Sequence, residues 1–241
     1  MERKIFLKKS IVALGATFIA PLVNSCIKDN DVTSGTGTTT GTESGSDSCT
    51  VSPTETAGPF PTKTPSTLVS SDIRSDRTGV AFTIKITINN TNNSCAALAG
   101  AIVDIWHCDA GGNYSEYGGS GMQSTDYTSV HFLRGRQTTD ASGLVTFTSI
   151  FPGWYSGRAP HIHVHVYDAS GSSLLVTQIA FPADVCNTVY TTATTYYTKG
   201  TQDTTNAADN VFSDSLASEL ATVSGSVADG YTLTQLVSVA A

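Results

Sequence analysis

The stretch from 151 to 167, FPGWYSGRAPHIHVHVY, constrains the fold of this chain more than any other feature. Its later positions alternate between histidine and aliphatic residues: His161, Ile162, His163, Val164, His165 and Val166. Side chains two residues apart on a β-strand share one face. The pattern therefore predicts a strand that buries an aliphatic face and presents three imidazoles on the other.

Three imidazoles on one strand face favour a metal site. Core packing alone rarely places histidine at three successive positions of a face, whereas a His-x-His pair on a strand directs two ring nitrogens at one point. A chance or surface placement of the histidines is the alternative. We expect a metal to bind on this strand.

Short strands separated by turn-forming residues account for much of the remaining chain. Further strand patterns lie at 79–89, 98–106, 130–132, 144–150, 174–181 and 231–239, and one helical pattern lies at 209–223. Only 14% of the residues are charged, and 21 are glycine. These features predict an all-β fold, a β-sandwich of mixed or antiparallel strands with short helical and loop excursions.

The first 26 residues predict a signal peptide of lipoprotein type. Basic residues precede an apolar run at 11–23 that is too short to span a bilayer. The run ends at Asn24-Ser25-Cys26, which resembles the lipid-attachment box of bacterial lipoproteins, with Cys26 as the lipidated residue. An ordinary signal peptide cleaved elsewhere and a twin-arginine signal are alternatives. We expect export, and contact with a membrane only through this lipid anchor.

Residues 27–48 are rich in Thr, Gly and Ser and predict a flexible tether, which leaves 49–241 as one folded domain. Its cysteines are Cys49, Cys95, Cys108 and Cys186. An even number in an oxidising compartment predicts two disulfides, in any of three pairings, and a catalytic cysteine is the weaker alternative. The net charge of −7 provides no basic face, which argues against nucleic acid as a partner.

Two further segments make the metal prediction specific. Residues 106–114 are WHCDAGGNY, and residues 152–163 are PGWYSGRAPHIH. Together they resemble the intradiol ring-cleavage dioxygenases, the class that cleaves catechol and protocatechuate. The resemblance runs from about residue 49 to the C-terminus. It is greatest to the exported, single-domain branch, because the tether stands where catechol-type enzymes have a helical dimerisation domain.

The resemblance implies a site with a mononuclear, non-haem Fe(III). Its ligands would be Tyr114, Tyr155, His161 and His163. The family's active-site arginine matches Arg158, and its glutamine on the next strand matches Gln178. The segment at 55–60, ETAGPF, resembles the family's opening, where Gly58 and Pro59 line the substrate pocket; Trp154 is a further predicted substrate contact.

The chemistry of these side chains agrees with ferric iron. A free tyrosine has a pKa of about 10 and ionises near neutrality only against a strong Lewis acid. The resemblance implies that a catechol-type substrate displaces Tyr155, which takes up a proton. It also implies that Arg158 stabilises negative charge on the ring during reaction with O₂. Cleavage between the hydroxyl-bearing carbons gives a cis,cis-muconate-type diacid.

Several alternatives remain open at this point. Tyr117 or Tyr127 is an alternative to Tyr114 as the ligand, while His165, His107 and His131 are expected to be structural. A different enzyme would bind copper or zinc through the three strand histidines. A third possibility is a non-catalytic surface lipoprotein that binds aromatic or carbohydrate ligands.

Overall fold

The computed structural model describes residues 50–241. The signal peptide predicted at 1–26 and the tether predicted at 27–48 lie outside the described residues, as do Cys26 and Cys49. No helix in the described part is long and apolar enough to cross a membrane.

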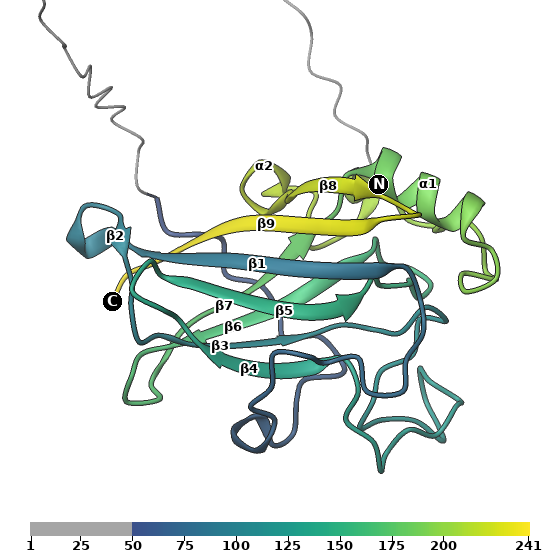
Figure 1. Ribbon diagram of the computed structural model, residues 1–241, viewed down its shortest axis with the longest axis horizontal. Coiled ribbons are helices and arrows are strands. Elements are labelled where there is room, and N and C mark those ends of the chain that lie inside the picture. The colour runs from purple at the N-terminus through teal and green to yellow at the C-terminus, as the bar shows by residue number, and fades with distance from the viewer. Residues whose placement is uncertain (1–49) are drawn as a thin grey trace, which may run out of the picture. The chain divides into compact units, whose positions relative to one another are not determined.

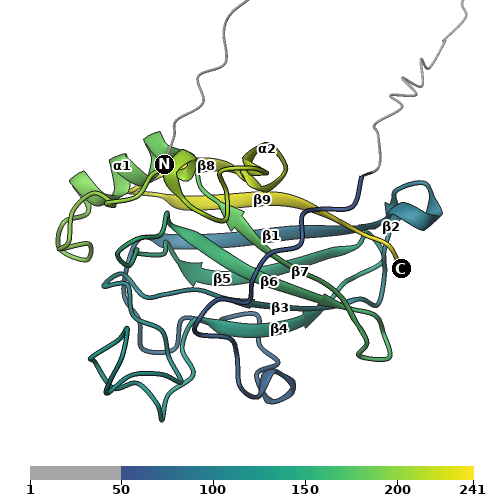
Figure 2. The same ribbon diagram turned by 180° about the vertical axis from the view of Figure 1, so that it is seen from behind.

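Two β-sheets form the described part of the chain (Figure 1 and Figure 2). The five-stranded sheet contains β1 (Ala81–Asn90), β2 (Ala96–Ala97), β5 (Leu144–Ile150), β8 (Thr222–Ser226) and β9 (Gly230–Val239). Strand β1 runs parallel to β9 and antiparallel to β5, so this sheet is mixed. The four-stranded sheet is antiparallel, in the order β4 (Arg134–Thr138), β3 (Ile102–Trp106), β6 (His161–Tyr167), β7 (Ser173–Ala180). The predicted all-β sandwich is confirmed.

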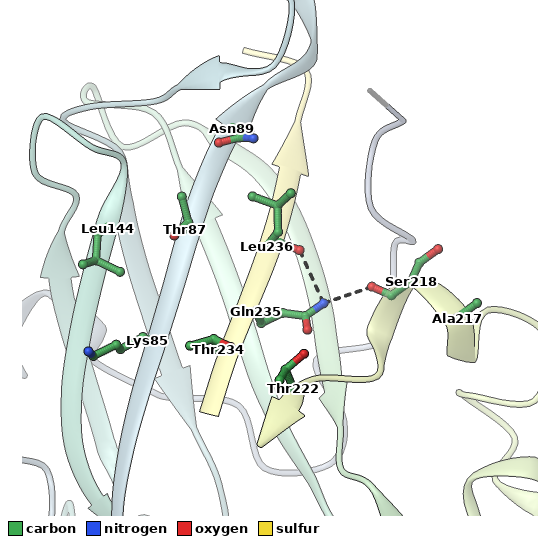
Figure 3. A pocket seen from close by; sticks show the side chains of 10 residues that line it. All are labelled: Lys85, Thr87, Asn89, Leu144, Ala217, Ser218, Thr222, Thr234, Gln235 and Leu236. Carbon is green, nitrogen blue, oxygen red and sulfur yellow. Dashed lines mark hydrogen bonds between the residues drawn. The ribbon is translucent and has the colours of Figure 1, made fainter. Parts of the chain in front are cut away.

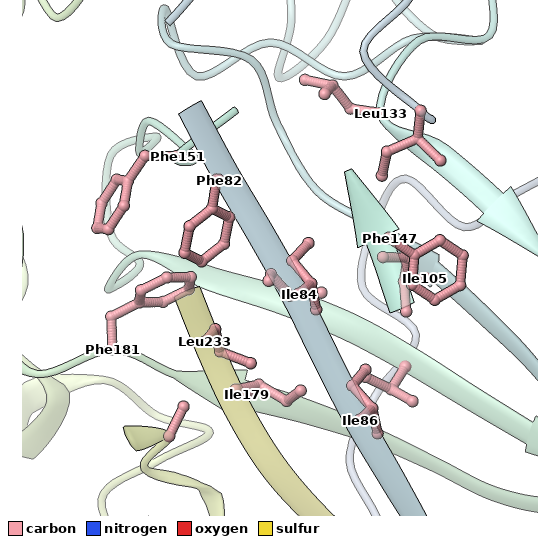
Figure 4. Close-up of a cluster of buried hydrophobic side chains, with 14 of the residues drawn as sticks. Phe82, Ile84, Ile86, Ile105, Leu133, Phe147, Phe151, Ile179, Phe181 and Leu233 are labelled. Atoms are coloured by element: carbon pink, nitrogen blue, oxygen red, sulfur yellow. The ribbon is translucent and has the colours of Figure 1, made fainter. Parts of the chain in front are cut away.

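The core lies between the sheets (Figure 4). Strand β1 contributes Phe82, Ile84 and Ile86 from one side, and Ile105 and Ile179 come from the four-stranded sheet. Each is at most 1% exposed, and full burial of such a side chain contributes about 1.5–3 kcal/mol. Because strand side chains alternate, the aliphatic residues of β6 enter this core and its histidines point to the outside of the sandwich.

Most of the predicted strands are present with shifted ends, but the strand predicted at 130–132 is wrong. Phe132 and Leu133 form a turn, and the strand begins at Arg134. Leu133 has a φ of 54°, a left-handed conformation that interrupts an extended chain. Both side chains are still buried, which explains why the apolar pattern resembled a strand.

The helix predicted at 209–223 is also wrong. Only α2 (Leu216–Glu219) forms there, and β8 follows it. The Asp209 carboxylate accepts a hydrogen bond from the Val211 amide, which favours a turn, and the Ala221 amide donates to the Ala180 carbonyl of β7. Tertiary pairing therefore overrides the helical pattern.

The longest helix, α1 (Ala183–Thr192), was not predicted from the sequence. It follows Pro182 and buries Cys186, Val189 and Tyr190, a spacing of three and four residues typical of a helix packed on a core. Three short 3₁₀ helices complete the described elements: η1 (Pro65–Thr67), η2 (Thr91–Asn93) and η3 (Asn206–Ala208).

The prediction of two disulfides is wrong for two of its four cysteines. Cys108 and Cys186 are free thiols, whereas Cys95 is disulfide-bonded. Cys108 packs with Trp106 beside the site described below, and Cys186 lies in the main core. Burial raises the pKa of both thiols, so they behave as small apolar side chains rather than nucleophiles.

Candidate active site

One row of side chains crosses the outer face of the four-stranded sheet. Arg134 of β4 pairs with Trp106 of β3, Trp106 pairs with His163 of β6, and His163 pairs with Gln178 of β7. Residues directly opposite in adjacent strands point to the same side of a sheet. The row therefore places His163 between an indole and an amide, and the Trp106 and His163 rings stack at 4.9 Å with 5° between their planes.

His161 and His163 direct their ring nitrogens at each other. Their Nε2 atoms lie 3.2 Å apart. His161 Nδ1 lies 2.6 Å from the Ala159 carbonyl, which can only accept, so Nδ1 carries the proton and Nε2 presents its lone pair. Among the described residues, none is within hydrogen-bonding geometry of His163 Nδ1. The backbone of Thr56 is nevertheless close enough to raise the pKa of this imidazole slightly against the effect of burial.

Tyr114 supplies the third donor. Its hydroxyl lies 3.2 Å from His161 Nε2, and its side chain is completely buried. The Phe60 ring stacks on it at 4.8 Å. The side chain of Gln123 accepts from the Tyr114 amide at 2.6 Å and donates to the Tyr114 carbonyl at 2.8 Å. Stacking and this amide clamp hold Tyr114 in place, and no sequence pattern indicated the role of Gln123.

Tyr155 supplies the fourth donor from the turn before β6. Its ring lies 5.9 Å from the Tyr114 ring and 5.6 Å from the His161 ring, measured between centroids. Unlike Tyr114, Tyr155 is only partly buried and lines a cavity of about 390 Å³. The Tyr155 side chain therefore has more room to move than the Tyr114 side chain, because Tyr114 is enclosed and Tyr155 borders the cavity.

The alternative tyrosines lie elsewhere. Tyr117 donates its hydroxyl to the Pro61 carbonyl at 2.6 Å. Tyr127 packs on Phe132 and lies 3.4 Å from Arg77 Nη1. The structure thus brings Tyr114, rather than either alternative, to the two histidines.

Burial keeps all four donors neutral in the metal-free protein. It lowers the pKa of His161 to about 3 and that of His163 well below the usual value. It raises the pKa of Tyr114 and of Tyr155, although Arg158 opposes the rise at both. Neutral imidazoles are competent metal ligands, and buried phenols ionise only when a strong Lewis acid replaces their protons.

The donor set fits a single metal ion. Two ligands held at about 2.1 Å from one first-row metal ion lie about 3 Å apart. His161 Nε2 lies 3.2 Å from both His163 Nε2 and the Tyr114 hydroxyl, close to this separation. Among residues 50–241, no three His, Cys, Asp or Glu side chains are arranged to hold a metal. A site on β6 therefore needs the tyrosines.

The other histidines have hydrogen-bond partners of their own. His165 Nε2 shares a hydrogen bond of 2.7 Å with the Ser173 hydroxyl, and the His165 ring stacks on the Tyr167 ring with 3.9 Å between centroids. His107 contacts the Ser149 hydroxyl at 2.7 Å, and His131 contacts the Glu116 carboxylate at 2.8 Å. Two strand histidines, not three, face the candidate metal position.

A fixed guanidinium lies beside the donors. Arg158 donates through Nε to Asp209 at 2.9 Å and through Nη2 to Gln178 Oε1 at 2.7 Å. Gln178 in turn donates to the Thr56 carbonyl at 2.8 Å, which ties the segment before Gly58 to β7. Sequence reasoning identified Arg158 and Gln178 but missed Asp209, because its partners are about 50 residues away.

Gly58 packs directly on the His163 ring. A Cβ atom at Gly58 would lie 2.8 Å from Cε1 and 3.2 Å from Nε2 of His163, and the Gly58 φ is 68°. Both the close approach and the positive φ require glycine. Gly58 therefore borders His163, a predicted metal ligand, as well as the predicted pocket.

The cavity beside Tyr155 is the candidate substrate site. Its lining residues are Thr56, Gly58, Pro59, Met122, Tyr155, Ser156, Gly157, Arg158, Asn210 and Val211. Trp154, predicted as a substrate contact, is not among these lining residues, because its indole donates to the Gly200 carbonyl at 2.9 Å and lies under the Lys199 ammonium. Tyr155, the next residue of this turn, does line the cavity.

A larger hollow of about 710 Å³ lies on the outer face of the five-stranded sheet, beside α2 (Figure 3). Its wall is mainly uncharged, with Thr87, Thr234 and Leu236, and Lys85 is its one titratable side chain. The side chain of Gln235 bridges to the carbonyls of Ser218 and Leu236. This hollow has no donor set for catalysis and is separated from the histidines by the core.

Known proteins resemble this chain in sequence and in fold. A family model described as Dioxygenase matches residues 58–209. The chlorocatechol 1,2-dioxygenase of Rhodococcus opacus is 28% identical over 145 residues, which are 52% of this chain and 52% of that protein. The chain thus spans about half the length of this curated relative.

Solved structures extend the similarity. An intradiol ring-cleavage dioxygenase from Tetranychus urticae is 27% identical, with a TM-score of 0.69 over 79% of this chain and 95% of that one. The dioxygenase domain of a carbohydrate-binding fusion protein from Streptomyces sp. SirexAA-E has the same fold, at 24% identity, a TM-score of 0.57, and coverage of 78% and 97%. The family match covers more than half of the chain and includes every donor of the site. The chain belongs to the intradiol ring-cleavage dioxygenase family.

Proposed function

We propose that this protein is a ferric dioxygenase that cleaves a catechol-type ring between its two hydroxyl-bearing carbons. One O₂ is consumed, both oxygen atoms enter the product, and the product is a cis,cis-muconate-type dicarboxylic acid. The observation that carries this proposal is the convergence of two imidazoles and two phenols beside an open cavity. Family membership supports the same reaction class.

Four side chains would hold a mononuclear, non-haem Fe(III): Tyr114, Tyr155, His161 and His163. When bound, the ion supplies the Lewis acidity that ionises phenols and makes a chelated diol electron-rich enough to react with O₂. Phenolates are hard anionic donors and favour ferric over ferrous iron.

The two tyrosines are suited to different roles. Tyr114 is enclosed by Phe60 and clamped by Gln123, so it stays a ligand throughout. Tyr155 borders the cavity and lies near Arg158, whose charge opposes the rise in its pKa. Tyr155 would therefore be the ligand that the diol replaces, and its oxygen would accept one of the two diol protons while the other is released to solvent.

Arg158 stabilises negative charge that builds on the ring during the reaction. Asp209 and Gln178 fix its guanidinium at the cavity wall, so little reorganisation is needed when charge develops. By analogy with single oxyanion donors, this interaction lowers the activation barrier by about 2–4 kcal/mol. Gln178 acts by holding Arg158.

A test of the metal assignment is the colour of the iron-loaded protein. A ferric ion bound by phenolates absorbs visible light, so the purified protein is expected to be red-brown. A colourless protein that contains one iron per chain would contradict the proposal, whether or not it binds catechol.

Tyr155→Phe is expected to weaken the visible band and slow ring cleavage by at least about tenfold, because the leaving ligand and proton acceptor are lost. The matched control is Tyr117→Phe, which removes the hydroxyl of a neighbouring tyrosine that bonds the Pro61 carbonyl instead. Its band is expected to be unchanged. The measurements are visible spectra at equal iron content and O₂ uptake with catechol. Unchanged uptake in Tyr155→Phe sinks the assignment of this residue.

The site of action is proposed to be outside the cytoplasm, with the chain anchored by a lipid on Cys26. The leader-like sequence at 1–26 and the disulfide-bonded state of Cys95 support this location. Metabolic labelling with a radioactive fatty acid tests it. Label is expected in the wild-type protein and absent from Cys26→Ala, and an unlabelled wild-type protein in the soluble fraction rejects the anchor.

A further inference from the structure

The substrate cavity has a single charged side chain in its wall. Arg158 is that residue, and the other lining residues are uncharged. Pro59, Met122 and Val211 form an apolar part of the wall, and Met122 is 70% exposed at its edge. A substituent on the bound ring therefore meets either this apolar part or the guanidinium.

The charge of Arg158 is already neutralised by the protein. The Asp209 carboxylate accepts from Arg158 Nε at 2.9 Å and is completely buried. It also accepts from the amides of Ala159 and Val211. These donors hold the pKa of Asp209 below its usual value despite burial, so the carboxylate is charged at neutral pH. The ion pair therefore attracts a distant anion only weakly, although the guanidinium can still donate to a ring oxygen that contacts it.

Further carboxylates surround this pair. Burial, followed by repulsion from Asp214, raises the pKa of Glu55, and Arg158 partly opposes the rise. Glu219 lies within reach of Glu55, Asp214 and Asp209, and burial is the largest cause that raises its pKa to about 7. Of these carboxyl groups, Asp209 and Glu55 interact with the Arg158 guanidinium itself.

No described lysine balances these groups. Lys63 donates to the Glu116 carbonyl at 2.6 Å and Lys199 lies over the Trp154 ring, while Lys85 lies on the five-stranded sheet. None of the three lines the substrate cavity. A carboxylate on the substrate ring would find no lysine in the cavity wall, and the one arginine there is already paired with Asp209.

We propose that the site selects catechols whose ring substituent is uncharged and discriminates against catechols that carry a carboxylate. This inference rests on the proposed function and specifies its substrate class. Uncharged substituents fit the apolar wall at Pro59, Met122 and Val211, whereas an anionic one meets no charged side chain except Arg158, which is already paired with the Asp209 carboxylate.

The sharpest test compares 3,4-dihydroxybenzoate with its methyl ester. The two have the same ring and the same substituent position, but only the acid is charged. The ester withdraws electron density from the ring more strongly, so ring reactivity alone favours the acid. We expect kcat/KM to be at least about tenfold higher for the ester at low ionic strength, and the preference to shrink as salt screens the charges. A ratio of one or less overturns the inference.

Asn210→Lys tests whether charge at the wall sets the preference. The new ammonium lies in the cavity wall and is expected to raise kcat/KM for the acid relative to the ester by about tenfold. Asn210→Gln is the control for side-chain length and is expected to leave the ratio unchanged. An equal change of the ratio in both variants shows that shape, not charge, discriminates, and rejects the proposal.

Failure of this inference is distinguishable from failure of the proposed function. Unsubstituted catechol is the reference substrate, and a change in the visible band of the iron-loaded protein reports the binding of catechol. If catechol is not cleaved and the protein is colourless, the proposed function fails. If catechol is cleaved and the acid is cleaved as efficiently as the ester, only the charge selection fails.

Discussion

Gly58→Ala is expected to bind iron about 10–100-fold more weakly than the wild type and to lose its colour and catechol cleavage accordingly. The added methyl group would lie 2.8 Å from Cε1 of the His163 ring, closer than carbon atoms can approach. Movement of the ring is limited, because Trp106 stacks on it with 4.9 Å between the ring centroids. His163 therefore turns away from His161, and the donor pair is broken.

The control must separate this clash from backbone strain. Gly58 has a φ of 68°, so alanine at this position is strained whatever it contacts. Gly100 has a φ of 78°, and a Cβ there meets nothing within 4 Å. Gly100→Ala has the same type of strain without the clash and is expected to keep its iron. The measurements are iron per chain, the visible band and the thermal unfolding curve of each variant.

Two results would contradict the account of Gly58. Equal iron loss in both variants would assign the effect to strain and not to the His163 ring. Full iron and full activity in Gly58→Ala would show that the segment at 55–60 moves away at little cost, and that it does not support the metal ligand.

Local patterns predicted the strand that carries the site. In β6 the alternation of histidine with Ile162 and Val164 is a property of neighbouring positions, and strand geometry alone sends the two sets to opposite faces. Composition and turn spacing likewise predicted the sandwich. Assignment of Tyr114 and Tyr155 needed the family resemblance, because no local rule links two tyrosines 41 residues apart (155 − 114).

The missed residues act through contacts across the sheet. Trp106 lies beside His163 only because β3 and β6 are paired in this register, and Asp209 reaches Arg158 from a loop 51 residues later. Gln123 clamps Tyr114 from within an irregular loop. Pairing and loop closure are set by the whole fold, so a single-sequence pattern does not contain them.

The wrong helix at 209–223 has the same cause. Its apolar residues have helical spacing, but Val211 packs with Phe212 against Ala159, and Leu220 forms a β-bridge with Ala180 of β7. Of the three residues with helical spacing, Val211 is buried, Leu216 is partly buried and Leu220 is exposed. Periodicity therefore identified neither the backbone conformation nor the full set of buried residues.

Arg134→Met is expected to destabilise the fold by about 3–5 kcal/mol, the cost of removing one partner from a buried charged network. Arg134 is 3% exposed and donates to the Ser115 carbonyl and hydroxyl, the Phe60 carbonyl and the Thr62 hydroxyl. It also lies 3.6 Å from the Glu116 carboxylate. Methionine fills similar space but leaves these acceptors without donors. The melting temperature is expected to fall by about 6–20 °C for a domain of this size.

The same guanidinium joins the two segments that enclose Tyr114. Phe60 stacks on the Tyr114 ring from one segment, and Ser115 follows Tyr114 in the other, so loss of Arg134 releases both at once. The visible band of the iron-loaded variant is therefore expected to broaden even at temperatures where the fold survives. Arg74→Met is the control, because Arg74 makes an exposed ion pair with Asp72 and its loss is expected to change stability by less than about 1 kcal/mol. If Arg134→Met melts like Arg74→Met, the guanidinium does not hold these segments together, and the enclosure of Tyr114 must come from Phe60 and Gln123 alone.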